Sequence, residues 1–256
     1  MALKKISIYC GYIALLVAVF LNFIIGCGND SYDPLWGPRL IHFEAKKALT
    51  SISFMEASEK QAFIDGKPTP LDKLMHLATH DVVEIRHLVA VNPSADDALL
   101  YQLASDLSSG VRQAVASNHK TSEAVLNKLS KDDSQIVIDE AMKNPNWSLD
   151  SLHNFYKEGV HVEAILRNPS VPTDILEKVL VGEDQFLMAA IADNSAITND
   201  LAIKLASKNS GLISMSLCTN PMVSKAILSL LSGDHDKRVR NCALHYMKIR
   251  YRSTEP

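Results

Sequence analysis

Two histidines, His76 and His80, stand four positions apart, with Asp81 and Glu84 close behind them. Residues four apart share one face of a helix, so this spacing could present two imidazoles to a zinc ion. The glutamate that follows the first histidine in metalloproteases is missing, and His80 falls where the helix is expected to end. We therefore predict no metal site and no cofactor. A small envelope enzyme or metal-binding protein that uses His76 and His80 is the alternative function.

The four cysteines are Cys10, Cys27, Cys218 and Cys242. They form no CxxC pair or Cys/His cluster, so neither zinc nor an iron-sulfur cluster has ligands at a suitable spacing. An oxidising compartment permits a disulfide between Cys218 and Cys242, whereas their repeat positions favour two small unpaired core residues. No GxSxG motif, glycine-rich phosphate loop or Cys/His/Asn set is present either. We predict that the protein is not an enzyme and has no catalytic residues.

The first residues form a positive, then apolar, then small-residue pattern. Lys4 and Lys5 precede an uncharged apolar run, and the run ends in Ile-Ile-Gly before Cys27. This junction resembles the lipobox of bacterial lipoproteins. The resemblance implies a signal peptide over residues 1–26, acylation of Cys27 and a polar tether over residues 27–38. Several acyl chains hold a protein on a membrane more durably than one chain does.

An uncleaved signal anchor is the alternative, because a run of about 20 apolar residues could span the bilayer core. In either case the lysines stay in the cytoplasm and the rest is exported. We thus expect a bacterial cell envelope protein that faces the periplasm or exterior. Removing residues 1–26 takes away two lysines and no acidic residue, which leaves 24 basic and 29 acidic side chains and a net charge of −5. This charge argues against nucleic acid as a partner.

Composition indicates which elements position these residues. Of the 256 residues, 47% are apolar, 21% are charged and 6% are aromatic, and ten glycines are spread thinly. Leu and Ala are more frequent than the β-branched and aromatic residues that strands prefer. We predict an all-α protein.

An asparagine recurs at spacings of 26, 26, 24, 26 and 26 residues, and Gly66 stands one period before the first. Asparagine tolerates the left-handed conformation that ends a helix, and the proline that follows four of the six cannot continue one. In a stack of repeats these side chains could bond backbone groups freed at helix ends. The predicted structural repeat markers are Asn92, Asn118, Asn144, Asn168, Asn194 and Asn220.

Apolar residues eight and eleven positions after each marker describe one helix, and those seven and three positions before it describe a second. Helices of eight to ten residues are marginal alone in water, so the pairs must stack. The sequence thus predicts a right-handed α-solenoid of about seven two-helix repeats, each about 26 residues long.

The repeat reads "VRxAVAxNPxxxxxxLxxLAxD", with its first half at residues 111–118 and its second half at residues 92–106. This pattern resembles the leucine-rich repeat variant family, whose repeats are HEAT-like in shape. The resemblance covers residues 66–247 and implies a right-handed superhelix in which one helix of each pair can be 3₁₀. The iron-sulfur domain described in that family has no counterpart, because its cysteines are missing.

The segments on either side of the repeats complete the domain organisation. Residues 39–65 are predicted as an N-terminal helical cap, residues 66–247 as the repeat solenoid and residues 248–256 as a C-terminal tail. The basic stretch from Lys237 to Arg252 is expected to form the polar outer face of a C-terminal cap, although it could also meet anionic lipid or an acidic partner.

A column of residues six positions before each marker is the candidate partner-binding surface. Helical geometry turns this position about 100° from the buried stripe, so in a stack it would form an apolar centre flanked by arginines. The alternative is that its middle members turn inward as core. The column contains Arg86, Arg112, Ile138, Val162, Met188, Ser214 and Arg240. We expect a lipid-anchored envelope protein that presents a helical-repeat surface to an unknown protein or peptide, as a scaffold or adaptor.

Overall fold

The computed structural model describes residues 38–251, and all sixteen regular elements in this range are α-helices. This result confirms the all-α prediction for the described part of the chain. The chain divides into two compact units, Met1–Glu44 and Ala45–Pro256. Helix α2 (Pro38–Leu49) crosses the boundary, and α3 (Ala57–Ile64) follows it within the predicted cap. None of the helices between residues 38 and 251 combines the length and apolarity that a membrane span requires.

The second unit contains seven pairs of helices after α3, at the places that the marker spacing predicts. The first helices of the pairs are α4 (Leu71–Leu77), α6 (Asp97–Leu103), α8 (Glu123–Leu129), α10 (Leu149–Glu158), α12 (Thr173–Val181), α14 (Asn199–Ala206) and α16 (Lys225–Leu231). The second helices are α5 (Val83–Val91), α7 (Ser109–Ser117), α9 (Gln135–Lys143), α11 (Val162–Leu166), α13 (Gln185–Ala192), α15 (Gly211–Thr219) and α17 (Lys237–Tyr251).

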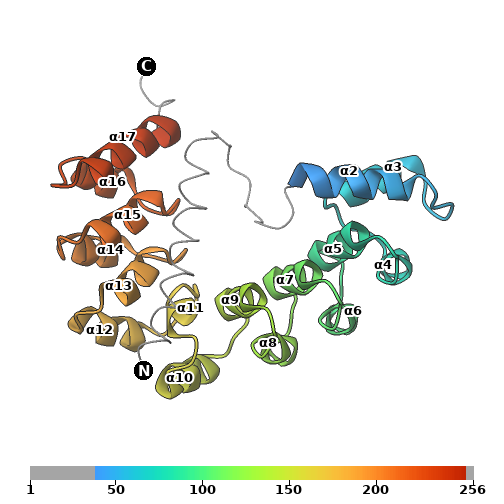
Figure 1. The fold of residues 1–256 in the computed structure, drawn as a ribbon, viewed down its shortest axis with the longest axis horizontal. Helices are drawn as coiled ribbons and strands as arrows, with labels where there is room; N and C mark the ends of the chain where they lie inside the picture. The colour runs from blue at the N-terminus through green and yellow to red at the C-terminus, as the bar shows by residue number, and fades with distance from the viewer. Residues whose placement is uncertain (1–37, 252–256) are drawn as a thin grey trace, which may run out of the picture. The chain divides into compact units, whose positions relative to one another are not determined.

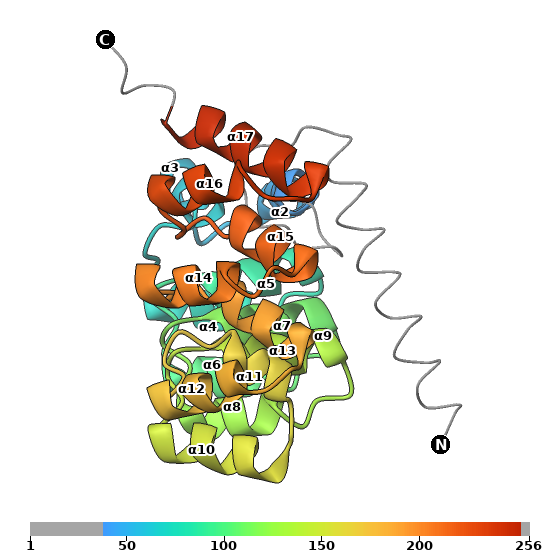
Figure 2. The same cartoon turned by 90° about the vertical axis from the view of Figure 1, so that its left-hand side faces the viewer.

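Within this unit the helices form two rows. Each second helix packs against the first helix of its own pair and against the second helix of the next pair, so that α5 to α17 make one continuous row. Figure 1 shows the odd-numbered helices from α5 on the inner side of a curve and the even-numbered helices from α4 on its outer side. The side view in Figure 2 shows the helices from α10 to α17 stacked in chain order.

The interior between the rows is built from the positions that the apolar spacing selects. Leu100 and Leu103 of one first helix are buried, as are Val111 and Val115 of the following second helix. Equivalent residues are buried in nearly every pair, and from Leu166 to Ala243 they join into one apolar cluster. Because burying such a side chain contributes about 1.5 to 3 kcal/mol, the stacking of pairs supplies the stability that short isolated helices lack.

The pair α10–α11 differs from the others. Its marker spacing is 24 residues instead of 26, and α11 has only five residues. Gly159 ends α10 in the left-handed conformation, and His161 adopts the same conformation directly before α11. The two residues that this repeat lacks are therefore missing from the first turn of its second helix. Helix α11 still packs against α9 and α13, so the row of second helices is not interrupted.

Two sequence expectations need correction. Both helices of every pair are α-helices, and no 3₁₀ segment occurs between residues 38 and 251. Runs of 3₁₀ helix longer than three or four residues are uncommon, and the shortest helix here has five residues. In addition, α17 continues to Tyr251, so residues 248–251 belong to the last helix instead of a tail.

Candidate functional site

The marker asparagines form a ladder of hydrogen bonds along the second unit. The Asn144 side-chain nitrogen donates to the carbonyl oxygens of Ala116 and Asn118 in the previous pair, at 2.7 and 3.0 Å. Its side-chain oxygen accepts from the backbone nitrogen of Asn146 at 2.9 Å. Four other markers make the same three bonds: Asn118, Asn168, Asn194 and Asn220. Asn92, at the start of the ladder, donates instead to Lys67 and Thr69.

The backbone conformation at the markers shows that the left-handed conformation expected for asparagine at these positions was wrong. Where a marker is a helix C-cap its φ lies between −63° and −68°, in the extended region and not in the left-handed one. The side chains are buried. Asparagine is needed because one amide can satisfy two carbonyls and one N–H group at once, which alanine or glycine cannot do.

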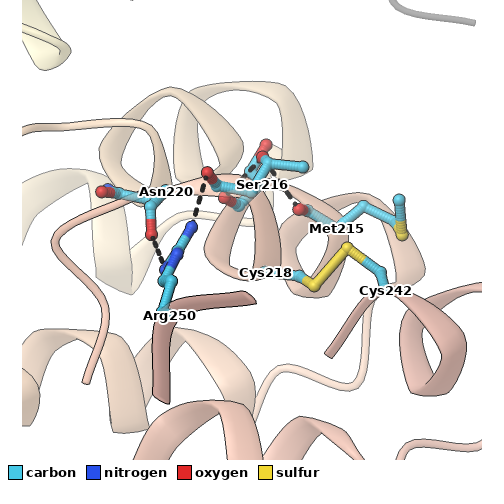
Figure 3. Close-up of a disulfide and its surroundings, with 7 residues drawn as sticks. Met215, Ser216, Cys218, Asn220, Cys242 and Arg250 are labelled. Carbon is cyan, nitrogen blue, oxygen red and sulfur yellow. Dashed lines mark hydrogen bonds between the residues drawn. A yellow bond between two sulfur atoms is a disulfide. The ribbon is translucent and has the colours of Figure 1, made fainter. Parts of the chain in front are cut away.

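Arg250 occupies the end of this ladder. Its guanidinium nitrogens donate to the carbonyl oxygens of Asn220 at 2.9 Å and Thr219 at 3.2 Å (Figure 3). The Asn220 carbonyl is one of the two that a further asparagine would bind, by analogy with the earlier rungs. Close by, Cys218 of α15 and Cys242 of α17 form a disulfide with a Cα–Cα distance of 6.3 Å. The two cysteines are buried in the core, as their repeat positions predict, and they are also joined by a disulfide rather than unpaired. Small core residues on neighbouring helices lie close enough for a disulfide to form.

The first two arginines of the predicted partner-binding column are engaged within the chain. Arg86 makes two hydrogen bonds to the Asp106 carboxylate and donates to the carbonyls of His80 and Asp81. Arg112 repeats this arrangement one pair later, with Asp132 as its acidic partner. Each guanidinium thus closes the loop of its own pair and ties it to the loop of the next pair.

These bridges change the acid-base properties of the aspartates. Burial opposes ionisation of Asp106, but hydrogen bonds from Arg86 and the Ser108 N–H outweigh it, so the pKa of Asp106 is lowered. Burial acts in the same way on Asp132, and hydrogen bonds from Arg112 and Ser134 again lower the pKa. Both carboxylates are therefore held in the charged form, as structural ion pairs require.

The rest of the column does not form the exposed surface that the sequence suggested. Met188 and Ser214 are buried, with 2% and 1% exposure, and Ile138 and Val162 are half-buried. Arg240 donates to the carbonyls of Asp234 and His235 in its own loop. The column lies between stacked layers, because each second helix packs against its neighbour on both sides and leaves little of that flank open.

The two histidines of the candidate metal site do not share a helix face. Helix α4 ends at Leu77, so His80 lies in the following loop, where its Nδ1 accepts from the backbone nitrogen of Val82 at 3.0 Å. His76 is exposed, and its ring lies 5.5 Å from that of Phe54. Between residues 38 and 251 no group of three or more His, Cys, Asp or Glu side chains could hold a metal ion. The proposed lipidation site, Cys27, lies outside the described residues.

The exposed apolar row lies two residues before the predicted column, eight positions before each marker. It comprises Ile136 on α9, Val160 before α11, Phe186 on α13 and Leu212 on α15, with exposures of 38%, 36%, 49% and 37%. The asparagine ladder joins the C-terminal ends of these packed helices, so the N-terminal ends of α9, α13 and α15 correspond in their layers, and the loop before the shortened α11 takes this place in its own layer. The apolar row therefore crosses four successive layers, and a hollow of about 480 Å³ lies at its Phe186–Leu212 end.

A polar cavity of about 370 Å³ lies at the other end of the same helices. It is lined by marker-adjacent residues, among them Lys143, Arg167 and Asp193, and by Glu140. The ion pairs here are long, with 3.5 Å from Arg167 to Asp193 and 3.4 Å from Lys143 to Glu140. Burial raises the pKa of Asp193, although its side chain keeps 36% exposure. Seven residues make two helical turns, so on α9 and α13 the apolar row and the polar cavity lie on one face, about 10 Å apart.

The apolar row is a candidate site that periodicity alone does not predict. Alignment on the markers does line up Ile136, Val160, Phe186 and Leu212, so the signal was present in the sequence. Periodicity gives the angle between a residue and the buried stripe, but not which flank the neighbouring helices cover. Comparison with known proteins does not identify the binding surface either, because no protein family, no curated protein and no solved structure matches this chain.

Proposed function

We propose that this protein is a lipid-anchored scaffold or adaptor of the bacterial cell envelope, whose helix pairs form a right-handed α-solenoid of leucine-rich repeat variant type. Its inner face binds another protein. The observation that carries this proposal is the apolar row, where four large apolar side chains stay more than a third exposed on α9, α13 and α15 and in the loop directly before α11. Aligned exposed apolar side chains of this kind are typical of interaction sites, whereas singly scattered ones are ordinary.

Charge supports a protein partner over nucleic acid. The polar cavity on the same face contains acidic and basic groups in equal number, with Glu140 and Asp193 beside Lys143 and Arg167. A phosphate backbone requires a basic surface, while an apolar centre with a mixed polar border is the usual anatomy of a protein interface. The ladder and the arginine bridges serve this function indirectly, because they fix the helices that carry the row.

Photo-crosslinking in the intact bacterium tests the binding face. A benzophenone amino acid at Phe186 should give a protein adduct of defined mass, and the same group at Leu230 should not, since Leu230 is 55% exposed on the outer row. Absence of an adduct at Phe186, or the same adduct at both positions, would contradict the proposal.

The membrane anchor requires a separate experiment. Cys27→Ser should leave an unprocessed precursor that palmitate no longer labels, because the acyl chains need the thiol. Equal labelling of the variant and the natural protein would exclude Cys27 as the lipidation site and leave the uncleaved signal anchor as the explanation of the apolar run.

A further inference from the structure

We infer that the segment that docks on the apolar row is an amphipathic helix with basic flanks. This inference rests on the proposed protein-binding function and adds the chemistry of the partner. The four row residues Ile136, Val160, Phe186 and Leu212 present one apolar contact per layer of the stack.

The spacing of the layers favours a helix as the docking segment. Packed helices lie about 8 to 10 Å apart, and residues seven apart on a helix are about 10.5 Å apart on the same face. A helix laid across α9, α11, α13 and α15 therefore meets each layer with one apolar residue in every seven. Three layer spacings correspond to about 18 helical residues. Residues three or four positions away on the same stripe would fill the space between layers.

Charges along the row favour a basic segment. Six acidic residues lie within three positions of a row residue in the sequence: Asp133, Asp139, Glu158, Glu163, Glu183 and Asp184. Asp133 and Glu163 are already paired with Arg112 and Arg167, so the other four carry the argument. Three lysines also stand close to the row in the sequence, Lys131, Lys157 and Lys208, and the Lys208 ammonium is already directed at the Leu180 carbonyl at 2.9 Å. Glu183 and Asp184 also line the hollow beside Phe186 and Leu212. Lys and Arg flanks on the partner would thus meet mainly opposite charge.

The ends of the array limit the row to its four central layers. The corresponding position is Glu84 on α5, Gly110 on α7 and Arg238 on α17. The apolar contact surface is therefore bounded on both sides, as the centre of an interface is by its polar rim. The acidic border also makes an anionic lipid surface a poor occupant of the row, because like charges repel.

A selection experiment tests the inference. The full-length protein in phosphatidylcholine nanodiscs is presented with a random peptide library of about 18 residues per peptide. Binders of the double variant Phe186→Asp, Leu212→Asp are removed. Peptides that survive should carry apolar residues three, four and seven positions apart and Lys or Arg on their flanks. Their Kd should rise at least ~10-fold with the double variant and with Glu158→Lys, Glu183→Lys, and should not change with Leu230→Asp.

Each other outcome overturns the inference. Selected peptides that are acidic, or that alternate apolar and polar residues as strands do, would exclude a basic helix. So would failure to enrich any peptide over the double variant. Row-dependent binding to phosphatidylglycerol vesicles would identify a membrane as the occupant, and row-dependent dimerisation would identify a second copy. If one of these results comes with a protein adduct at Phe186, the proposed function stands and only the helix inference fails. Without an adduct, both fail. Thermal unfolding by circular dichroism checks that the variants fold.

Discussion

The N-terminal and C-terminal repeats of the second unit solve the same stacking problem with different chemistry. Between α5 and α9 the layers are tied by the arginine bridges of Arg86 and Arg112 to aspartates of the next loop. Further along, Met188 occupies the same column position as apolar core, and Ser214 bonds the Asp234 carboxylate at 2.9 Å. A disulfide then ties α15 to α17. The common asparagine ladder thus allows the flanking position to vary freely.

This difference has a functional meaning. Loops at the N-terminal end are held by ion pairs, and the positions that correspond to the apolar row there are Glu84 and Gly110. In the central layers, where the arginines are replaced by Ile138, Val162 and Met188, large side chains are left exposed two residues earlier, as the apolar row. The repeats that lost the bridge are therefore among those that carry the proposed binding face.

The largest expected effect comes from Met188→Lys. A lysine at a side chain with 2% exposure would leave a charge without a partner in the C-terminal core, so the free energy of unfolding should fall by about 4 kcal/mol. Urea unfolding measures this loss. Met222→Lys is the matched control, because Met222 is 60% exposed and should change stability little. Equal urea midpoints for the two variants would show that the column is open to solvent at this layer.

Removing the disulfide should act on the C-terminal repeats alone. Cys218→Ala with Cys242→Ala opens a loop between residues 24 apart, which should cost about 3 kcal/mol by the chain-entropy estimate. Hydrogen exchange resolved by peptide should show faster exchange in α15 and α17 and unchanged exchange in α5 and α7. Faster exchange spread evenly over all repeats would mean that the array unfolds as one unit.

Arg112→Ala should act on the opposite end. The Asp132 carboxylate, with 8% side-chain exposure, would lose its bidentate partner, and two loop carbonyls would lose their donor. We expect a loss of about 2 to 3 kcal/mol, with faster exchange centred on α7 and α9. Arg238→Ala provides the control, because that side chain is 79% exposed and pairs with Asp236 at the surface. Similar losses from both substitutions would contradict a special role for the column.

The shared ladder should respond less to a single change. Asn118→Ala removes two donors and one acceptor from buried backbone groups, so a loss of about 1 to 2 kcal/mol is expected. Asn127→Ala, at an exposed position of α8, is the control. An unchanged urea midpoint would mean that water replaces the amide and that the ladder contributes no stability.

The smallest expected effect is a difference in acid stability between the N-terminal and C-terminal repeats. The folded pKa values of Asp106 and Asp132 are lowered, so their stabilisation is present above the ordinary aspartate pKa of about 3.9 and is lost as the pH falls through the lower folded values. Near pH 3, exchange corrected for its intrinsic pH dependence should therefore quicken more in α7 and α9 than in α13 and α15. A uniform response would show that the bridges do not set acid stability.

Periodicity was sufficient to predict the helices, their pairing in the chain and the buried positions, because these depend on local spacing and on the burial of apolar faces. Marker spacing also located the turns, although the conformation assigned to asparagine was wrong. Which flank of a second helix faces solvent was beyond reach, since it depends on how neighbouring layers cover that helix. Met188 and Phe186 are two residues apart in the sequence, and the structure buries the first and exposes the second.

The ladder also bears on how such a chain can change its length over evolution. Each marker bonds only to its own turn and to the turn of the pair before it, so duplicating or deleting one whole unit of 26 residues leaves every remaining rung with the partner it needs. An insertion of another length inside a helix would shift the rungs out of register. Arg250 caps the ladder in part, because its guanidinium occupies the Asn220 carbonyl, which is one of the two carbonyls on which another unit would be added. Array length is thus free to drift by whole units, provided that the last helix keeps its arginine.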